Sequence, residues 1–174
     1  MSWYLGRLAG FDIESTGVSP ERDRIVTACV VQCGGTEAVA SATWMADPGL
    51  DIPEAAAAVH GITTERARAE GRPAGEVVEQ VVTALTAVVL SGIPVVAMNA
   101  AYDLTMLDRE ARRHGVQPLA ETVGDDLHAQ QTVWAREQAE SLADYFRRTP
   151  GKEDRAKFVR GDWPLIPHQR SESL

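Results

Sequence analysis

The chain of 174 residues has little cysteine and no long apolar run. Its longest apolar stretches, such as 81–90, are far shorter than the roughly 20 residues that cross a membrane, so we expect no membrane association. The first residues do not lead from a basic segment into an apolar run, so we expect no signal peptide. Cys29 and Cys33 lie about 13 Å apart along a predicted strand, too far for a disulfide. Two free thiols are typical of a reducing compartment, and we expect a cytoplasmic protein.

Basic side chains are also scarce. The chain has 17 Lys and Arg against 25 Asp and Glu, for a formal net charge of −8. Proteins that coat nucleic acid nonspecifically bind by neutralising phosphates with basic side chains, so this class is excluded. The negative net charge is still compatible with an enzyme that binds the end of a nucleic acid through metal ions. The length fits one domain with a core of its own.

The order of the predicted elements favours an α/β fold. Strand-like runs at 8–13, 24–33 and 38–45 come first, and Gly34-Gly35 predicts an antiparallel hairpin between the second and the third. Apolar spacing predicts an amphipathic helix over 74–90, a strand buried on both faces at 94–98, and helices over 102–114 and about 125–148. From 149 the composition predicts an extended or flexible tail. We therefore expect a mixed β-sheet flanked by helices, with a long C-terminal helix and a tail.

Two carboxylates end the first predicted strand. Asp12 and Glu14 are two residues apart, so they share one side of the strand while Ile13 points to the core. Two carboxylates so close repel each other unless a cation lies between them, and oxygen ligands favour Mg²⁺ or Mn²⁺. A sharp turn, Ser15-Thr16-Gly17, follows. The alternative interpretation is a solvated strand end followed by a β-turn.

A second polar cluster follows the predicted strand at 94–98. Asn99 and Asp103 lie where this strand runs into the next helix. By themselves they are typical of a helix start, with an Asn cap and an acid favoured by the helix dipole. Because ligands of open α/β sheets bind at the carboxyl ends of strands, we expect this cluster to lie beside Asp12 and Glu14.

Together the clusters resemble motifs of a known enzyme family. The segment Phe-Asp-Ile-Glu-Ser-Thr-Gly at 11–17, His-Gly-Ile-Thr at 60–63 and Asn-Ala-Ala-Tyr-Asp at 99–103 resemble the DEDD-superfamily (DnaQ-like) 3′–5′ exonucleases, which have a ribonuclease H-like fold. The resemblance covers about residues 7–118. It implies an exonuclease-like domain at 1–123, a C-terminal helix at 124–148 and a tail at 149–174.

The resemblance also implies roles for individual residues. Asp12 would bridge two divalent ions, Mg²⁺ or Mn²⁺, Glu14 would bind the ion that holds the attacking water, and Asp103 would support both ions. The terminal nucleotide at the 3′ end of DNA or RNA would be held by Ser15, Thr16, Gly17 and Asn99. These ions would supply the positive charge that the chain itself lacks.

The third motif of this family is missing from the sequence. It carries a general base and a metal-binding Asp as His-x4-Asp or Tyr-x3-Asp, and no His or Tyr of the chain has an Asp at that spacing. Because positioned proton transfer contributes roughly 10²–10⁴-fold to a rate, we expect impaired hydrolysis. The alternative is a catalytically inactive module that binds nucleic acid or a protein.

Three explanations for this gap are open. An internal segment that carries the third motif is absent between about 118 and 128. Alternatively, His128 serves as a substitute base with Asp125 or Asp126, although the acids also fit an ordinary helix start. In the third explanation, the helix at 125–148 forms a homodimer and the second copy supplies the missing groups. The sequence does not decide between DNA and RNA, or between proofreading, repair and trimming.

Overall fold

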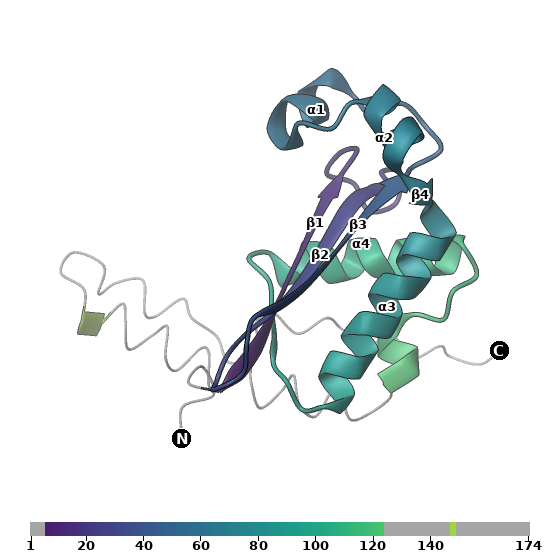
Figure 1. The fold of residues 1–174 in the computed structure, drawn as a ribbon. Helices are drawn as coiled ribbons and strands as arrows, with labels where there is room; N and C mark the ends of the chain where they lie inside the picture. The colour runs from purple at the N-terminus through teal and green to yellow at the C-terminus, as the bar shows by residue number, and fades with distance from the viewer. Residues whose placement is uncertain (1–5, 124–146, 149–174) are drawn as a thin grey trace. The chain divides into compact units, whose positions relative to one another are not determined.

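The computed structural model describes residues 6–123 and 147–148 (Figure 1). Its contacts divide the chain after Gly124 into two units. The second unit contains the expected helix at 125–148 and the tail at 149–174, and nearly all of it lies outside the described residues. The fold below is therefore that of 6–123.

A mixed β-sheet forms the centre of this unit. Its strands among the described residues are β1 (Arg7–Ser15), β2 (Ile25–Gly34), β3 (Ala40–Asp47), β4 (Arg72–Pro73) and β5 (Val95–Val96). They are ordered β4-β3-β2-β1-β5. The pairs β1–β2 and β2–β3 are antiparallel, whereas β5 and β4 add in parallel at the two edges. The expected antiparallel hairpin and the mixed sheet are both confirmed.

Helices flank the sheet within the described residues, and the four with established bounds are labelled α1 to α4. They are α1 (Glu54–His60), α2 (Thr64–Glu70), α3 (Ala74–Leu90) and α4 (Ala100–Arg113). The prediction of a helix over 74–90 is confirmed at both ends, and the helix expected over 102–114 begins two residues earlier. No helix of the described residues is long and apolar enough to cross a membrane.

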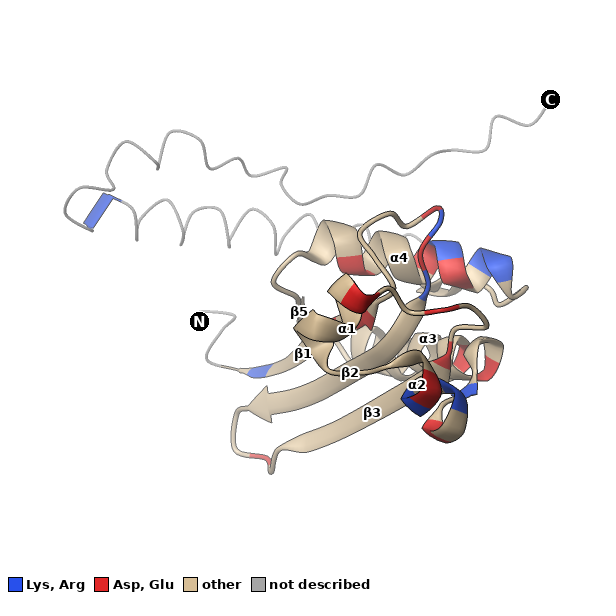
Figure 2. Ribbon diagram, turned by 90° about the horizontal axis from the view of Figure 1, so that it is seen from above, with Lys and Arg blue, Asp and Glu red and all other residues tan. Residues whose placement is uncertain are grey.

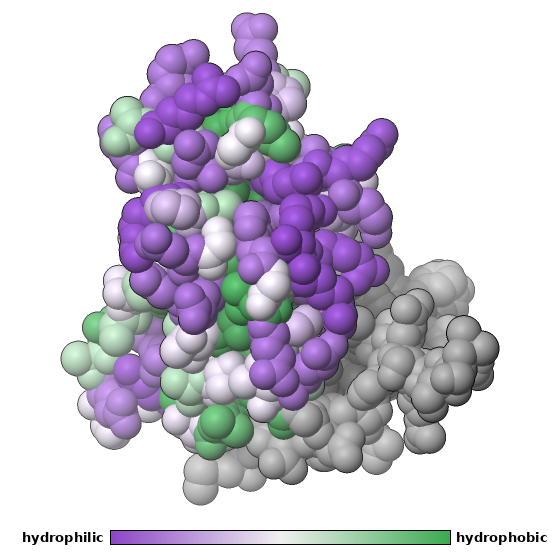
Figure 3. Space-filling model, turned by 90° about the vertical axis from the view of Figure 1, so that its right-hand side faces the viewer, coloured by the Kyte–Doolittle hydropathy of each residue, from purple (hydrophilic) through white to green (hydrophobic). Residues whose placement is uncertain are grey.

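The core lies between the sheet and the two longer helices. Helix α3 contacts α4, β2 and β3, and α4 contacts β1 and β2. The apolar stripe of α3 is buried and includes Val77, Val81 and Leu85. The facing side of β1 contributes Ala9 and Phe11 to the same core. Since α3 turns its apolar side inward, the face shown in Figure 3 is largely hydrophilic. The alternation along β1 leaves Asp12 and Glu14 on the side opposite this core.

The short helices α1 and α2 pack on a smaller apolar cluster at one end of the sheet. Ile52, Ile62 and Ala67 are buried there against Val26 of β2. His60 accepts a hydrogen bond at Nδ1 from the backbone N–H of Ile62, at 3.2 Å. In this contact the histidine closes the turn that joins the two helices.

The strand expected at 94–98 differs from its prediction. Strand β5 has only two residues, paired with Ala9 and Gly10 of β1. Val96 is 37% exposed and Met98 is 98% exposed, so burial on both faces is wrong. The reason is that β5 is the edge strand of the described sheet, and the chain turns away toward α4 directly after Val96. Cys29 and Cys33 are both free thiols on β2, as expected.

Candidate active site

Asp12 and Glu14 lie near the carboxyl end of β1. Asp12 is opposite Cys29 of β2 and Glu14 is opposite Thr27, with an irregularity in the ladder directly after Glu14. Between the two acids, Ile13 is only 7% exposed, whereas Asp12 is exposed and Glu14 half-buried. The strand thus presents both carboxylates on the side away from the core.

Asp103 joins these acids from a segment about ninety residues further along the chain. It lies in the first turn of α4, where its N–H donates to the Asn99 carbonyl at 3.1 Å, and it is only 4% exposed. The pKa of Asp103 is raised to about 6, first by burial and then by the negative charge of Asp12, and backbone hydrogen bonds partly offset this rise. One of those bonds comes from Ile13 of β1. The two acidic motifs therefore meet at the carboxyl end of β1.

The donor set fits a hard divalent cation. None of the ion pairs within the described part of the chain involves Asp12, Glu14 or Asp103. A buried carboxylate beside another carboxylate is destabilised as an anion, and a cation between them would relieve that cost. Residues 6–123 and 147–148 contain no group of three His, Cys, Asp or Glu side chains already close enough to hold a metal ion. Oxygen donors of this kind suit Mg²⁺ or Mn²⁺.

The turn after β1 is fixed by its own hydrogen bonds. Thr16 is 2% exposed, and its hydroxyl accepts from the Arg24 N–H at 3.0 Å and donates to the Asp23 carboxylate at 3.2 Å. Its backbone N–H donates to the Arg24 carbonyl at 2.9 Å. A Cβ added to Gly17 would lie 2.6 Å from the Asp23 carboxylate, so a larger residue there would displace the Asp23 side chain. The side chain of Thr16 thus holds the turn together.

Asn99 is the N-cap residue of α4, as its position suggests, but it caps the helix through its backbone alone. Its side chain makes no capping hydrogen bond, while its backbone carbonyl accepts from the N–H groups of Tyr102 and Asp103. The expected helix start, with Asn99 at the N-cap and Asp103 in the first turn, is therefore present. Asn99 is exposed, so its amide is free to face a ligand.

Tyr102 belongs to this site and was not singled out from the sequence as a site residue. Its hydroxyl lies 2.7 Å from the Ser15 hydroxyl and donates to the Gly17 carbonyl at 2.7 Å. Burial raises the pKa of Tyr102; the hydrogen bond with Ser15 lowers it, while nearby acids raise it further. The phenol therefore stays protonated at neutral pH. The residue directly precedes Asp103, which is the one signal in the sequence that could have drawn attention to it.

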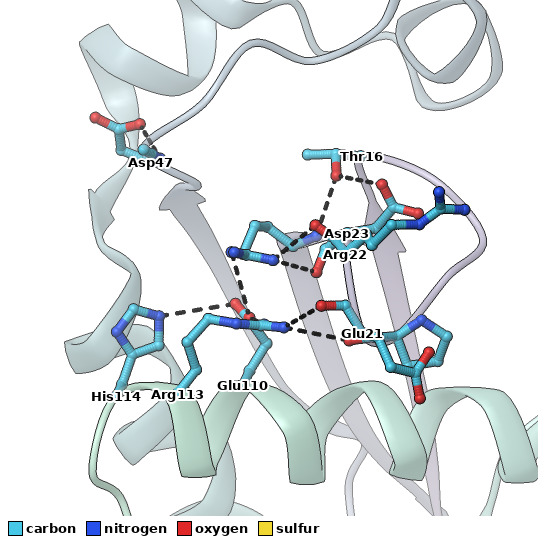
Figure 4. A network of polar contacts seen from close by, with 11 residues as sticks. Thr16, Glu21, Arg22, Asp23, Asp47, Glu110, Arg113 and His114 are labelled. Carbon is cyan, nitrogen blue, oxygen red and sulfur yellow. Dashed lines mark hydrogen bonds and ion pairs between the residues drawn. The ribbon is translucent and has the colours of Figure 1, made fainter.

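A second polar network ties α4 to the loop after the turn (Figure 4). Glu110 is fully buried and pairs with Arg113, with Arg24 at 3.9 Å and with His114 at 3.8 Å. Arg113 in turn donates to the backbone carbonyls of Pro20 and Glu21, at 3.3 and 3.0 Å. Figure 2 shows that charged residues gather on the helices and loops, whereas β2 and β3 carry almost none. The network holds loop 18–24 against the helix that carries Asp103.

The substitute base proposed from the sequence, His128, lies outside the described residues together with Asp125 and Asp126. Its place relative to Asp12 and Glu14 thus stays a prediction.

Comparison with known families supports the resemblance. The family model described as Exonuclease (RNase_T) matches residues 9–156. The match extends past residue 118, where the resemblance that we identified in the sequence ends. No curated protein matches the chain in sequence.

Solved structures share the fold. Exonuclease I from Methylocaldum szegediense is 20% identical with a TM-score of 0.53, over 67% of this chain and 25% of that one. Two structures of Escherichia coli exonuclease I, a zinc-bound complex with single-stranded DNA and a complex with a dT13 oligonucleotide, are 18% identical with a TM-score of 0.54. Each covers 75% of this chain and 30% of that one. The chain thus spans about a quarter to a third of the length of these structures.

Proposed function

Because the chain belongs to the exonuclease family, we propose that it hydrolyses nucleotides from the 3′ ends of DNA or RNA. The observation that carries this proposal is the meeting of Asp12 and Asp103, whose charges interact although the residues are far apart in sequence. Both lie in segments that resemble the first and second motifs of 3′–5′ exonucleases. A structural role does not account for a buried acid placed beside a second acid without a cationic partner in the described chain.

In this proposal, Asp12, Glu14 and Asp103 would hold two divalent ions, Mg²⁺ or Mn²⁺. When bound, the ions would lower the pKa of a water molecule and stabilise the leaving 3′ oxygen. The protein's own contribution is to bring Asp103 of α4 to the strand end that carries Asp12 and Glu14. The same ions would bring positive charge to a chain whose net charge is −8.

The residues around the acids would position the terminal nucleotide. The hydroxyl of Thr16 is engaged by Asp23 and Arg24, so this residue would contribute its backbone. Asn99, whose side chain is exposed and makes no capping bond, would contact the nucleotide directly. Ser15 and Gly17 would shape the turn on which the nucleotide rests. Single-stranded DNA is the first substrate to test, because solved structures of exonuclease I with the same fold contain it.

The missing third motif favours slow hydrolysis by the chain on its own. A base would come from His128 or from the helix at 125–148 of a second copy in a homodimer. An internal segment absent between about 118 and 128 would explain the gap, and a longer relative that aligns without interruption there would contradict that explanation. The second candidate function, an inactive module that binds nucleic acid or a protein, is favoured by the same missing motif.

The test is shortening of 5′-labelled single strands of DNA and RNA in Mg²⁺ or Mn²⁺. We expect stepwise loss from the 3′ end that stops in EDTA and in Asp12→Asn. The control Glu79→Gln, at an exposed acid of α3, should leave the rate unchanged. A specific activity that rises with protein concentration would support the homodimer. No shortening by folded protein at high concentration would contradict the exonuclease and favour the binding module.

A further inference from the structure

The sheet does not by itself fix Asp103 beside Asp12. Strand β5 pairs with β1 only through Val95 and Val96, opposite Ala9 and Gly10. The chain then leaves the sheet for residues 97–99 before α4 begins. This parallel ladder therefore ends two residues before Asp12 and seven before Asp103, and the spacing of the two motifs depends also on contacts made beyond it.

Tyr102 makes such a contact. Its hydroxyl donates to the Gly17 carbonyl and lies equally close to the Ser15 hydroxyl, at 2.7 Å in both cases. The Ser15 hydroxyl also lies 2.7 Å from the Gly17 carbonyl. The two hydroxyl oxygens and the Gly17 carbonyl oxygen thus form a closed triangle of contacts. Each hydroxyl donates its one hydrogen within this triangle, so the orientation of both hydroxyls is fixed. The contact between Ser15 and Gly17 is local, so within this triangle the link from α4 to the turn runs through Tyr102, beside the hydrogen bond of Asp103 with Ile13 and the contacts of Glu110 and Arg113 further along α4.

We propose that the Tyr102 hydroxyl is a positioning group that sets the distance between Asp103 and the two acids of β1. Tyr102 is bonded to Asp103 through the chain, and Ser15 follows Glu14, so the hydrogen bonds join the immediate neighbours of two of the three carboxylates. The same bonds orient the turn at 15–17 that would hold the nucleotide. This inference rests on the proposed function, since it gives the triangle a role in binding the ions.

The substitution Tyr102→Phe isolates the hydroxyl because it keeps the ring. With the protein in EDTA, we expect faster amide exchange at residues 15–17 and in the first turn of α4. On titration with Mn²⁺, we expect the midpoint of thermal stabilisation to rise about 3- to 10-fold, the range that the loss of one good hydrogen bond implies. Ser15→Ala should shift the midpoint in the same direction but less, because Tyr102 keeps its bond to the Gly17 carbonyl.

Ser91→Ala is the matched control. It removes a hydroxyl that donates to a backbone carbonyl, that of Ala87, at 2.7 Å, at the far end of α3. We expect its Mn²⁺ midpoint and its amide exchange at 15–17 to equal those of the wild type. A change in this control equal to that in Tyr102→Phe would overturn the inference, because the effect would then be one of general stability.

The outcomes separate this inference from the proposed function. Tyr102→Phe with a lower melting temperature in EDTA but an unchanged Mn²⁺ midpoint would show a purely structural tyrosine and overturn the inference. If the wild type neither binds Mn²⁺ nor shortens nucleic acid, the proposed function fails. In that case amide hydrogen exchange in EDTA still tests the inference. Equal exchange at residues 15–17 in Tyr102→Phe and in the wild type would refute the link between α4 and the turn.

Discussion

The buried carboxylate of Asp103 should make the folded protein less stable without its ions. Its pKa is raised from 3.8 to about 6 by burial and by the charge of Asp12. Because the folded state holds this proton more tightly than the unfolded state, stability falls as pH rises through about 4 to 6 and stays reduced above that range. At 1.36 kcal/mol per pKa unit, the cost at neutral pH is at most about 3 kcal/mol.

Asp103→Asn removes this cost while keeping the size of the side chain. In EDTA at pH 8, we expect the variant to be more stable than the wild type by about 1–3 kcal/mol. At pH 4 the wild-type acid is largely protonated, so the two proteins should be nearly equal. The measurement is urea unfolding followed by circular dichroism at both pH values, with Glu79→Gln as the control that changes neither. Mn²⁺ should then reverse the order, because it stabilises the wild type alone.

The opposite result would refute this reasoning. A variant that is less stable than the wild type by the same amount at pH 8 and pH 4 would mean that Asp103 serves the fold as a hydrogen-bond acceptor. The repulsion between Asp103 and Asp12 would then contribute nothing measurable.

Two further predictions concern the support of the site. Glu110→Gln should lower the free energy of unfolding by about 2–4 kcal/mol, because the substitution leaves Arg24 and Arg113 without their buried anion. Urea unfolding measures this loss, and a loss below about 0.5 kcal/mol would contradict the prediction. Gly71→Ala should lower the melting temperature, at a cost of about 1–3 kcal/mol, because a Cβ there would lie 2.5 Å from the Asp47 backbone N.

The elements that the sequence predicted best are those that repeat a pattern over many residues. Helix α3 was predicted over its full length because its valines and Leu85 recur at three- and four-residue spacing. The hairpin of β2 and β3 followed from one β-branched run, at 24–33, and the Gly-Gly turn that closes it. Strand β5 was predicted too long, because a short apolar run does not reveal which of its residues find a partner.

The candidate site was predictable only where motif and strand end coincide. Asp12 and Asp103 were expected to be neighbours because the carboxyl ends of parallel strands share one edge of a sheet. Tyr102 and Glu110 were missed because each acts through contacts with residues far away in the sequence, to Ser15 and Arg24 respectively. Periodicity and composition carry no trace of such contacts.

The most direct test of the central claim compares a linear single strand with a circle of the same sequence. In Mn²⁺, the wild type should shorten the linear 5′-labelled strand one nucleotide at a time and leave the circle intact, and Asp12→Asn should leave both substrates intact. A cut circle, or shortening that persists in Asp12→Asn, would contradict an exonuclease site built on Asp12, Glu14 and Asp103.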